Sequence, residues 1–482
     1  MDHANPLMTQ SFGADPYAMV YEDRVYIYMT GDIFEYDTEG KIVENTYGQI
    51  HQIRVISTAD MVNFTDHGSI RAAWKQGAAS WARNSWAPAA AWKEIDGKPQ
   101  FFLYFADGGG GIGVLQADSP VGPFRDPLGK GLITKETPNC ADVLWLFDPA
   151  VLVDDDGRAY LYFGGGVPEG KQADPGTARV VELGDDMISI AGEPQKIDVP
   201  YLFEDSGIHK AAGKYYYTYC TNWQVDEAGT AQYGFRNAEI ACMVSDSPMG
   251  PFTLQETILK NPGTVFGLYG NNHHCVFQFQ ENWYIAYHTR VLEAAMGVEK
   301  GYRCTHIDQF AMGEDGNIGT IRQTLKGRQQ LCYVNPFEEN RAVNMAVMGG
   351  VECVPSNGTS KYYGCGAMAL GGIDTGDFIK IQGVDFGEKG VREIHVTAKP
   401  GSEGEGVICL RLDGPEGEII GYLPVDASGG ESPEGADTEG SAPANGEFRK
   451  YTAQVEQVSG VHDLYFIFYG SGYEIETWQF QQ

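Results

Sequence analysis

Runs of alternating aromatic and aliphatic residues, each placed after a Gly, Asp or Asn turn, recur five times in the first 290 residues. The runs read EDRVYIYMTGD, GKPQFFLYFADG, DGRAYLYFGGG, GKYYYTYCTN and ENWYIAYHTR. Alternation with a period of two after a turn predicts hairpin strands with one buried face. Long helical patterns are missing from the sequence, so we expect an all-β chain.

The five runs align on one tyrosine each, and the aligned tyrosines are separated by 76, 58, 57 and 68 residues. They are Tyr28, Tyr104, Tyr162, Tyr219 and Tyr287. A repeat of this length built from short strands is typical of the blades of a β-propeller. Five copies therefore predict a five-bladed β-propeller over residues 1–335.

The pattern of hydrophobic and polar residues changes after NPFEEN, residues 335–340. Residues 336–482 contain alternating stretches such as DFIKIQGVDFG, VICLRLDGP and HDLYFIFYG, which predict a separate β-sandwich. A chain of 482 residues also exceeds the size at which one hydrophobic core keeps growing. Within the second domain, residues 426–447 are acidic and nearly free of large apolar side chains, which predicts a mobile surface loop.

The composition narrows the choice of partners. The formal net charge is −31, from 65 acidic and 34 basic residues. Such a charge repels nucleic acids and anionic membrane surfaces, so neither is an expected partner. A neutral ligand such as a sugar polymer is compatible with it.

The nine cysteines favour a reducing compartment. Their number is odd, and no CxxC or Cys/His zinc spacing is present. Several stand inside apolar runs, where a free thiol acts as a small core residue. No signal peptide is visible at the N-terminus and no apolar stretch reaches 18 residues, so we expect a cytoplasmic protein.

Residues that can perform chemistry precede each of the five aligned tyrosines by 13 to 18 positions. They are Asp15, Trp86, Asp148, Glu204 and His273. Asp15 and Asp148 are each followed by proline, which cannot donate to a strand ladder and favours the start of an innermost strand. Five blades would bring these five positions to one central axis, and three of them are carboxylates.

Two carboxyl groups on either side of a glycosidic bond are the minimum apparatus for its hydrolysis. One group must be ionised to activate water, and the other must be protonated to assist the leaving oxygen. A third carboxylate nearby helps to keep the pKa of the acid raised, because like charges disfavour a second ionisation. The sequence therefore predicts a glycosidase site.

Five ordered motifs make the chain resemble glycoside hydrolase family 43 across residues 5–335. They are ADPY, SWAP, FDPAVLVDDDG, FEDSGIHK and NNHH. The resemblance implies that Asp15 is the general base, Asp148 the pKa modulator and Glu204 the general acid. It also implies that no organic cofactor is needed and that the configuration at the anomeric carbon is inverted. Inversion requires the carboxyl groups of the base and the acid to lie about 6.5–9.5 Å apart.

The resemblance extends to substrate and metal contacts. Trp86 would supply an apolar wall for the sugar, and Trp223 would stack on a neighbouring sugar. Arg303 resembles the arginine that binds substrate at the bottom of the pocket, with Arg290 as an alternative. His273 resembles a histidine that binds a calcium ion near the propeller axis. The acidic run at 154–156 is better interpreted as a hairpin turn.

Residues 338–482 resemble carbohydrate-binding module family 6. Two departures from that family stand out, because Ala342, Val343 and Asn344 replace the acidic stretch that binds a structural calcium, and Glu474 replaces a binding asparagine. Glu476 is the remaining candidate ligand for that calcium, and Tyr362 or Tyr363 would offer a stacking face. We expect this module to bind sugar weakly or not at all.

The combination of FGADPY, NNHH and YHTR with such a module most resembles enzymes that remove α-L-arabinofuranosyl branches from arabinoxylan or its oligosaccharides. The alternative is a β-xylosidase, or a dual activity, on xylo-oligosaccharides. A third hypothesis from another class is a non-catalytic sugar-binding propeller, which would have no need of three converging carboxylates. The sequence does not indicate an oligomeric state.

Overall fold

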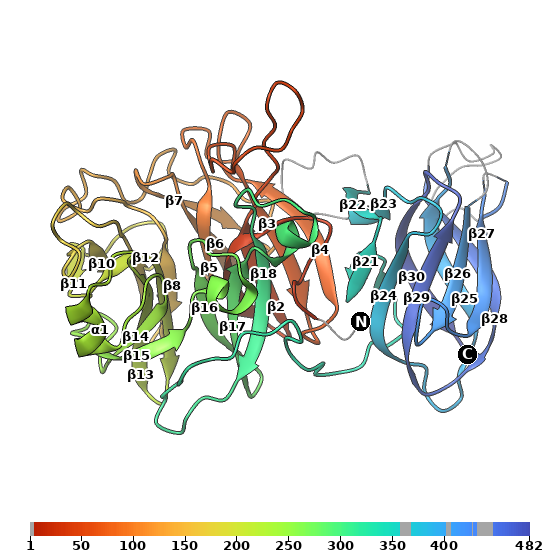
Figure 1. The fold of residues 1–482 in the computed structure, drawn as a ribbon. Helices are drawn as coiled ribbons and strands as arrows, with labels where there is room; N and C mark the ends of the chain where they lie inside the picture. The colour runs from red at the N-terminus through yellow and green to blue at the C-terminus, as the bar shows by residue number, and fades with distance from the viewer. Residues whose placement is uncertain (1–3, 357–367, 402–405, 427, 431–446) are drawn as a thin grey trace. The chain divides into compact units, whose positions relative to one another are not determined.

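Short antiparallel strands make up most of the molecule (Figure 1). The computed structural model describes residues 4–356, 368–401, 406–426, 428–430 and 447–482. Its helices within these ranges are α1 (Glu227–Tyr233), α2 (Pro262–Phe266) and α3 (Val291–Ala295). The prediction of an all-β chain is confirmed. No helix in the ranges given is long and apolar enough to cross a membrane.

The chain divides into two compact units. The first contains residues up to Val55 together with Ser69–Gly327, and the second contains Ile56–Gly68 and most of the chain from Arg328 onward. The division into domains at residues 335 and 336 stays a prediction. Most of the acidic stretch 426–447 lies outside the described residues, as do Tyr362 and Tyr363.

Five antiparallel sheets follow one another along the first part of the chain. The first contains β1 (Ala14–Tyr21), β2 (Arg24–Thr30), β3 (Gln52–Thr58) and β4 (Phe64–Arg71), and the second contains β5 (Trp86–Ile95), β6 (Lys98–Ala106) and β7 (Ile112–Ala117). The third contains β8 (Ala150–Val153), β9 (Ala159–Phe163), β10 (Ala178–Glu182) and β11 (Gln195–Ile197). The fourth contains β12 (Leu202–Ala211), β13 (Lys214–Thr221), β14 (Ile240–Ser245) and β15 (Thr253–Leu259), and the fifth contains β16 (His274–Phe279), β17 (Asn282–Thr289) and β18 (Cys304–Phe310).

Each of the five aromatic runs forms the second strand of one sheet, namely β2, β6, β9, β13 and β17. The aligned tyrosines have no exposed surface, so their phenol oxygens need partners inside the protein. Three of them find a partner in the following sheet. Tyr28 donates to the carbonyl of Pro120 at 2.5 Å, Tyr104 to that of Met187 at 2.6 Å and Tyr162 to that of Pro248 at 2.6 Å.

These bonds also explain a repeated motif. Pro120 and Pro248 are the prolines of the segments DSPVGPF and DSPMGPF, and each segment follows the third strand of its sheet. The carbonyl of the proline is therefore the acceptor for the tyrosine of the preceding sheet. The acidic run at 154–156 forms the turn between β8 and β9, closed by the Asp154 amide on the Arg158 carbonyl at 2.8 Å, as predicted.

The second unit contains two further sheets. One has the order β22 (Glu352–Pro355), β23 (Met368–Gly371), β30 (Glu474–Gln481), β25 (Val391–Lys399) and β28 (Arg449–Val458), and β19 (Asn340–Arg341) pairs with β30. The other has the order β21 (Val347–Gly349), β24 (Phe378–Asp385), β29 (Val461–Tyr469), β26 (Gly406–Leu412) and β27 (Ile419–Val425). Both sheets contribute to one buried cluster, in which Phe466 of β29 packs on Trp478 of β30. The short strand β20 (Asn344–Met345) pairs with β4.

Candidate active site

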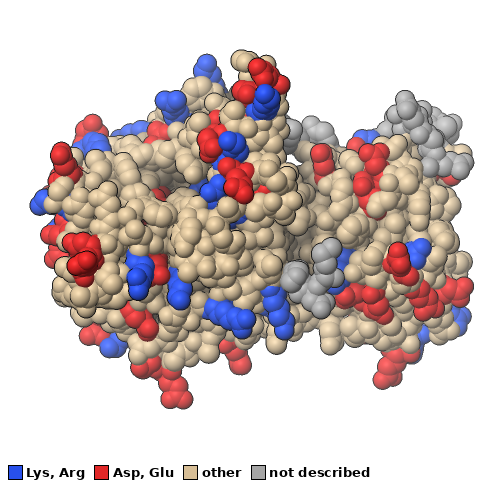
Figure 2. All heavy atoms as spheres, viewed as in Figure 1, with Lys and Arg blue, Asp and Glu red and all other residues tan. Residues whose placement is uncertain are grey.

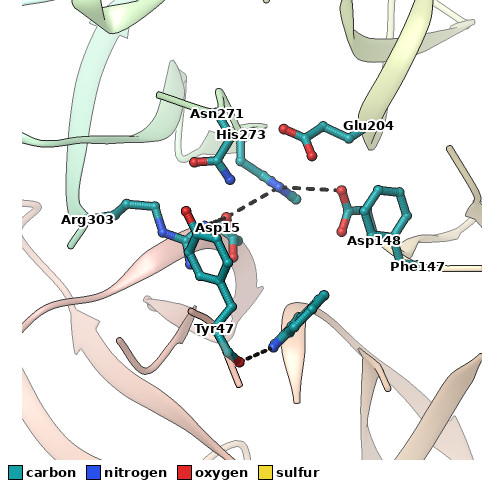
Figure 3. A pocket seen from close by; sticks show the side chains of 9 residues that line it. Asp15, Tyr47, Phe147, Asp148, Glu204, Asn271, His273 and Arg303 are labelled. Carbon is teal, nitrogen blue, oxygen red and sulfur yellow. Dashed lines mark hydrogen bonds and ion pairs between the residues drawn. The ribbon is translucent and has the colours of Figure 1, made fainter. Parts of the chain in front are cut away.

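One pocket in the first unit collects most of the residues that the sequence predicts (Figure 3). The cavity volume of the pocket is about 110 Å³. Its lining consists of Asp15, Tyr47, Trp86, Phe147, Asp148, Glu204, Asn271, His273 and Arg303. All three predicted carboxylates, the predicted wall, the arginine and the histidine are therefore brought together.

Irregular strand starts turn these side chains into the pocket. The pairing with the partner strand slips at one place in β1 and in β5 and at two places in β12, and the skipped residues include Asp15, Ala87 and Asp205. These three have φ angles of 47°, 40° and 68°, and Asp148 has a φ of 48°. A bulge with a residue in the left-handed region re-aims a side chain at a modest cost in strain.

Counted from the regularly paired part of each strand, the acidic residues occupy two different positions, not one equivalent position in every sheet. Asp15, Asp148 and Asp205 each stand two residues before the residue from which their strand pairs regularly, namely Tyr17, Ala150 and Gly207. Glu204 stands one residue earlier and corresponds to Trp86 and Phe147. The alignment on tyrosines is thus displaced by one residue in the fourth sheet, because Gly207 pairs with Thr218 and not with Tyr219.

Asp15 lies among positively charged and hydrogen-donating groups. Arg303 Nη1 donates to its Oδ1 at 2.8 Å, and the same guanidinium forms a two-pronged pair with Asp32. Burial acts to raise the pKa of Asp15, but Arg303, with smaller effects of His273 and His288, outweighs it. The pKa of Asp15 therefore falls well below its usual value, and the group is ionised.

Glu204 and Asp148 are in the opposite situation. Burial, followed by the charge of Asp148 and then that of Asp15, raises the pKa of Glu204 well above its usual value. Burial and the charge of Asp15 also raise the pKa of Asp148, although the Asp205 amide donates to Asp148 Oδ2 at 3.0 Å. Glu204 Oε1 is buried and has no hydrogen-bond partner within the described ranges. This half of the pocket therefore disfavours the simultaneous ionisation of Glu204 and Asp148.

His273 lies between the acids. Its Nδ1 is 3.5 Å from Asp15 Oδ1 and 3.9 Å from Asp148 Oδ2, while its Nε2 is 3.1 Å from Asp205 Oδ1. Burial lowers the pKa of His273 despite these carboxylates. Two of the dashed lines in Figure 3 join the imidazole of His273 to Asp15 and to Asp148.

The donor set for a metal ion is incomplete. Within the described residues no group of three or more His, Cys, Asp and Glu side chains is placed to hold a metal. Both ring nitrogens of His273 face carboxylates, and the carbonyl of Glu476 accepts from the amide of Ala342 in the second unit. The residues present therefore do not by themselves form a calcium site at either place.

An aromatic wall closes one side of the pocket. Trp86 Nε1 donates to the carbonyl of Tyr47 at 3.0 Å, and the two rings meet edge to face with centroids 6.3 Å apart. The Tyr47 ring also covers the guanidinium of Arg303, whose Cζ lies 4.9 Å from the ring centroid. Phe147 lines the same pocket beside Asp148.

Two predicted substrate contacts lie outside this lining. Trp223 follows β13 and is 37% exposed. Arg290 pairs with Glu293 and donates from Nη1 to the Tyr269 carbonyl at 2.9 Å. Of the two candidate arginines, Arg303 is the one that lines the pocket.

Tyr47, Phe147 and Asn271 also line the pocket, and none of them was predicted from the sequence. Phe147 and Asn271 each stand three residues before a regularly paired strand residue, as Trp86 and Glu204 do. Counting from the strand register would have found both. Tyr47 stands between β2 and β3, where no repeat marks it.

Comparison with known families gives two matches. The model of glycosyl hydrolases family 43 matches residues 3–318, and the model of carbohydrate binding module family 6 matches residues 341–482.

Two named relatives extend over the whole chain. An arabinoxylan arabinofuranohydrolase of Paenibacillus polymyxa is 45% identical over 493 residues, covering 99% of this chain and 74% of that protein. An arabinoxylan arabinofuranohydrolase of Bacillus subtilis (strain 168) is 43% identical over 497 residues, covering 100% and 93%.

A solved structure agrees over the same length. The crystal structure of a glycoside hydrolase family 43 arabinoxylan arabinofuranohydrolase from Bacillus subtilis in complex with cellotetraose superimposes with a TM-score of 0.91 at 42% identity. The match covers 100% of this chain and 98% of that one.

Proposed function

Because the chain belongs to glycosyl hydrolases family 43, we propose that its pocket is the active site of an arabinoxylan arabinofuranohydrolase. The enzyme releases α-L-arabinofuranosyl branches from arabinoxylan or its oligosaccharides. One observation supports this role above the others: the same pocket holds Asp15, whose pKa is lowered chiefly by Arg303, and Glu204, whose pKa is raised by burial and by Asp148. Hydrolysis of a glycosidic bond requires an ionised base and a protonated acid at once.

In this proposal Glu204 gives its proton to the glycosidic oxygen, and Asp15 takes a proton from the attacking water. Asp148 keeps the pKa of Glu204 raised, since a second negative charge beside Glu204 is unfavourable. Water attacks the face opposite the leaving group, so the anomeric configuration inverts. No organic cofactor is needed, because both proton transfers are performed by carboxyl groups.

Substrate binding is assigned to the remaining lining. Trp86 and Phe147 offer apolar surface to the sugar ring, while Arg303 offers hydrogen bonds at its base. Trp223, which is exposed beside β13, is proposed to contact a neighbouring sugar.

Hydrolysis of nitrophenyl α-L-arabinofuranoside, nitrophenyl β-D-xyloside and arabinoxylan tests the proposal. We expect release of arabinose from the first and third substrates, and the first product anomer seen by NMR to be the inverted one. Preferential hydrolysis of the xyloside would favour the alternative, a β-xylosidase; a 31% identical relative from Humicola insolens is named xylosidase/arabinosidase. Absence of turnover on all three substrates would refute the function.

The proposal includes the architecture around the site. We infer that the five antiparallel sheets are the blades of a five-bladed propeller over residues 1–335, and that residues 336–482 form a β-sandwich. The tyrosine bonds between consecutive sheets and the core shared by the last two sheets support this. We propose that the second domain contributes little sugar binding, which affinity electrophoresis of the full chain in arabinoxylan tests.

Two further expectations stay proposals. Calcium at His273, or at Glu476, would require ligands beyond the side chains described, and thermal unfolding with added calcium or EDTA tests it. Cytoplasmic localisation is tested by cell fractionation. Figure 2 shows acidic side chains spread over the visible face with basic ones between them, which fits the neutral sugar polymer expected from the net charge of −31.

A further inference from the structure

A fourth carboxylate, Asp205, lies directly behind the acid half of the pocket. It has no exposed surface, and it occupies in β12 the position that Asp15 occupies in β1. Asp205 does not line the pocket itself. The proposed mechanism gives it no part, although a buried carboxylate is costly unless it is well bonded.

The side chain of Asp205 is held by two adjacent histidines of the fifth sheet. Its Oδ2 lies 2.5 Å from His274 Nδ1, and its Oδ1 accepts from the His274 amide at 3.2 Å. Oδ1 also lies 3.1 Å from His273 Nε2. The far nitrogen of His274 is 2.8 Å from Thr218 Oγ1 on β13. The carboxylate thus ties β12 to the start of β16.

This network needs a glycine beside it. A Cβ at Gly207 would lie 2.3 Å from Thr218 Oγ1 and 3.2 Å from the His274 ring. Any side chain there would therefore displace the hydroxyl or the imidazole. The absence of a side chain at Gly207 lets the Thr218–His274 bond form.

The backbone of Asp205 faces the catalytic groups. Its amide belongs to the peptide that follows Glu204, and this amide donates to Asp148 Oδ2 at 3.0 Å. One peptide unit is therefore shared by the proposed acid and the proposed modulator. The φ of Asp205 is +68°, a conformation that a non-glycine residue keeps only when its surroundings enforce it. The bonds from the side chain to His274 and His273 provide that enforcement.

We propose that Asp205 is a positioning residue. It fixes the Glu204–Asp205 peptide and so holds the acid Glu204 and its modulator Asp148 in their relative positions. The inference rests on the proposed function, because it assigns Asp205 to the acid half of that mechanism. It acts through Glu204 and Asp148 and does not touch the substrate.

The test compares Asp205→Asn with wild type on two arabinofuranosides, one with a dinitrophenyl leaving group and one a natural arabinoxylo-oligosaccharide. The natural substrate needs the acid, whereas the dinitrophenolate leaves with little assistance. We expect kcat on the oligosaccharide to fall about 100-fold, with less than about a fivefold fall on the dinitrophenyl substrate. KM should change by less than about twofold on either substrate, because Asp205 lies outside the pocket lining.

Asp308→Asn is the matched control. Asp308 is also buried and bonded, to Tyr287 and Thr324, but it does not line the pocket. A structural defect of this kind should change both substrates equally. Thr218→Val is a second test variant, which removes only the far end of the network and keeps the proposal testable if Asp205→Asn does not fold. We expect Thr218→Val also to lower kcat more on the oligosaccharide than on the dinitrophenyl substrate, but by a smaller factor than Asp205→Asn.

Equal losses on both substrates in Asp205→Asn and Thr218→Val, or no loss in either, would overturn the positioning role. A wild-type protein that hydrolyses neither arabinofuranoside would instead overturn the proposed function. Selective loss on the poor leaving group in the two variants, with none in the control, establishes the role.

Discussion

The two halves of the pocket contain the same functional group in opposite charge states. On one side, Asp15 accepts from Arg303, which is itself paired with Asp32. On the other side, burial raises the pKa of Glu204 most, and the charges of Asp148, Asp15 and Asp205 raise it further. Burial alone would raise the pKa of both groups; Arg303, with smaller effects of His273 and His288, reverses this for Asp15, whereas Arg303 only partly offsets it for Glu204.

The largest expected effect comes from removing either half. Asp15→Asn and Glu204→Gln should each lower kcat on arabinoxylo-oligosaccharide about 10²- to 10⁴-fold, the range for general acid–base groups. On a dinitrophenyl arabinofuranoside Glu204→Gln should recover most of its activity, whereas Asp15→Asn should not. Steady-state kinetics on both substrates measures this. Recovery in Asp15→Asn would reverse the two roles.

Replacing the arginine tests why the halves differ. In Arg303→Met the pKa of Asp15 should rise by about 1–3 units, the usual effect of a neighbouring arginine on an aspartate. The acidic limb of the pH profile of kcat/KM should therefore move to higher pH. Arg303→Lys keeps the charge and loses the two-pronged pair with Asp32, so it should move the limb less. An unmoved limb in Arg303→Met would show that another group sets the charge of Asp15.

The halves should also respond oppositely in stability. At pH 7, Asp15→Asn leaves part of the buried Arg303 without its anion and should lower the free energy of unfolding by about 1–3 kcal/mol. Glu204→Gln removes a group whose ionisation the fold opposes, so its melting temperature should rise. Calorimetry of both variants measures the contrast. A lower melting temperature for Glu204→Gln would contradict the claim that the fold opposes the ionisation of Glu204.

The sign of the pH dependence follows from the two shifts. The pKa of Asp15 is lowered in the fold, so its stabilising contribution is present above its unfolded value of 3.8 and is lost as pH falls through its folded pKa. The pKa of Glu204 is raised, so its contribution is present below 4.5 and is lost as pH rises toward its folded pKa. The melting advantage of Glu204→Gln should therefore grow from pH 4.5 to pH 8.

The smallest expected effect distinguishes Trp86, which lines the pocket, from Trp223, which lies outside its lining. Trp86→Ala should raise KM for nitrophenyl arabinofuranoside about tenfold, a typical result of losing one stacking partner. Trp223→Ala should leave this substrate unaffected, because Trp223 lies outside the pocket lining. It should weaken only longer substrates. A rise in KM for the nitrophenyl substrate in Trp223→Ala would place that side chain beside the cleaved sugar.

Many of the strands and pocket residues could be predicted from the sequence, because a hairpin strand produces a local alternation of buried and exposed residues. The alternation around Tyr28, Tyr104 and Tyr162 marked the second strand of three sheets correctly, and Asp-Pro marked Asp15 and Asp148 as pocket residues. The resemblance to a known family gave their roles. The one-residue displacement in the fourth sheet was hidden, because the equivalent position is held by Thr218, which has no aromatic ring, while the adjacent Tyr219 fits the aromatic pattern.

Other contacts left no local signal. Asp32 pairs with Arg303, which is distant in the sequence, and no pattern near either residue announces the pair. Tyr47 reaches the pocket from the connection between β2 and β3. Such contacts depend on how separate sheets come together, which neither periodicity nor turn chemistry encodes.

The hydroxyl bonds of Tyr28, Tyr104 and Tyr162 bear on how such a chain could be shortened or cut. Each bond satisfies a buried oxygen with a carbonyl from the sheet that follows in the chain. A fragment that ends after any of these sheets would therefore lose the carbonyl that accepts this hydrogen bond. Truncation products should be unstable at the new edge, and two complementary fragments should reassemble in preference to folding alone.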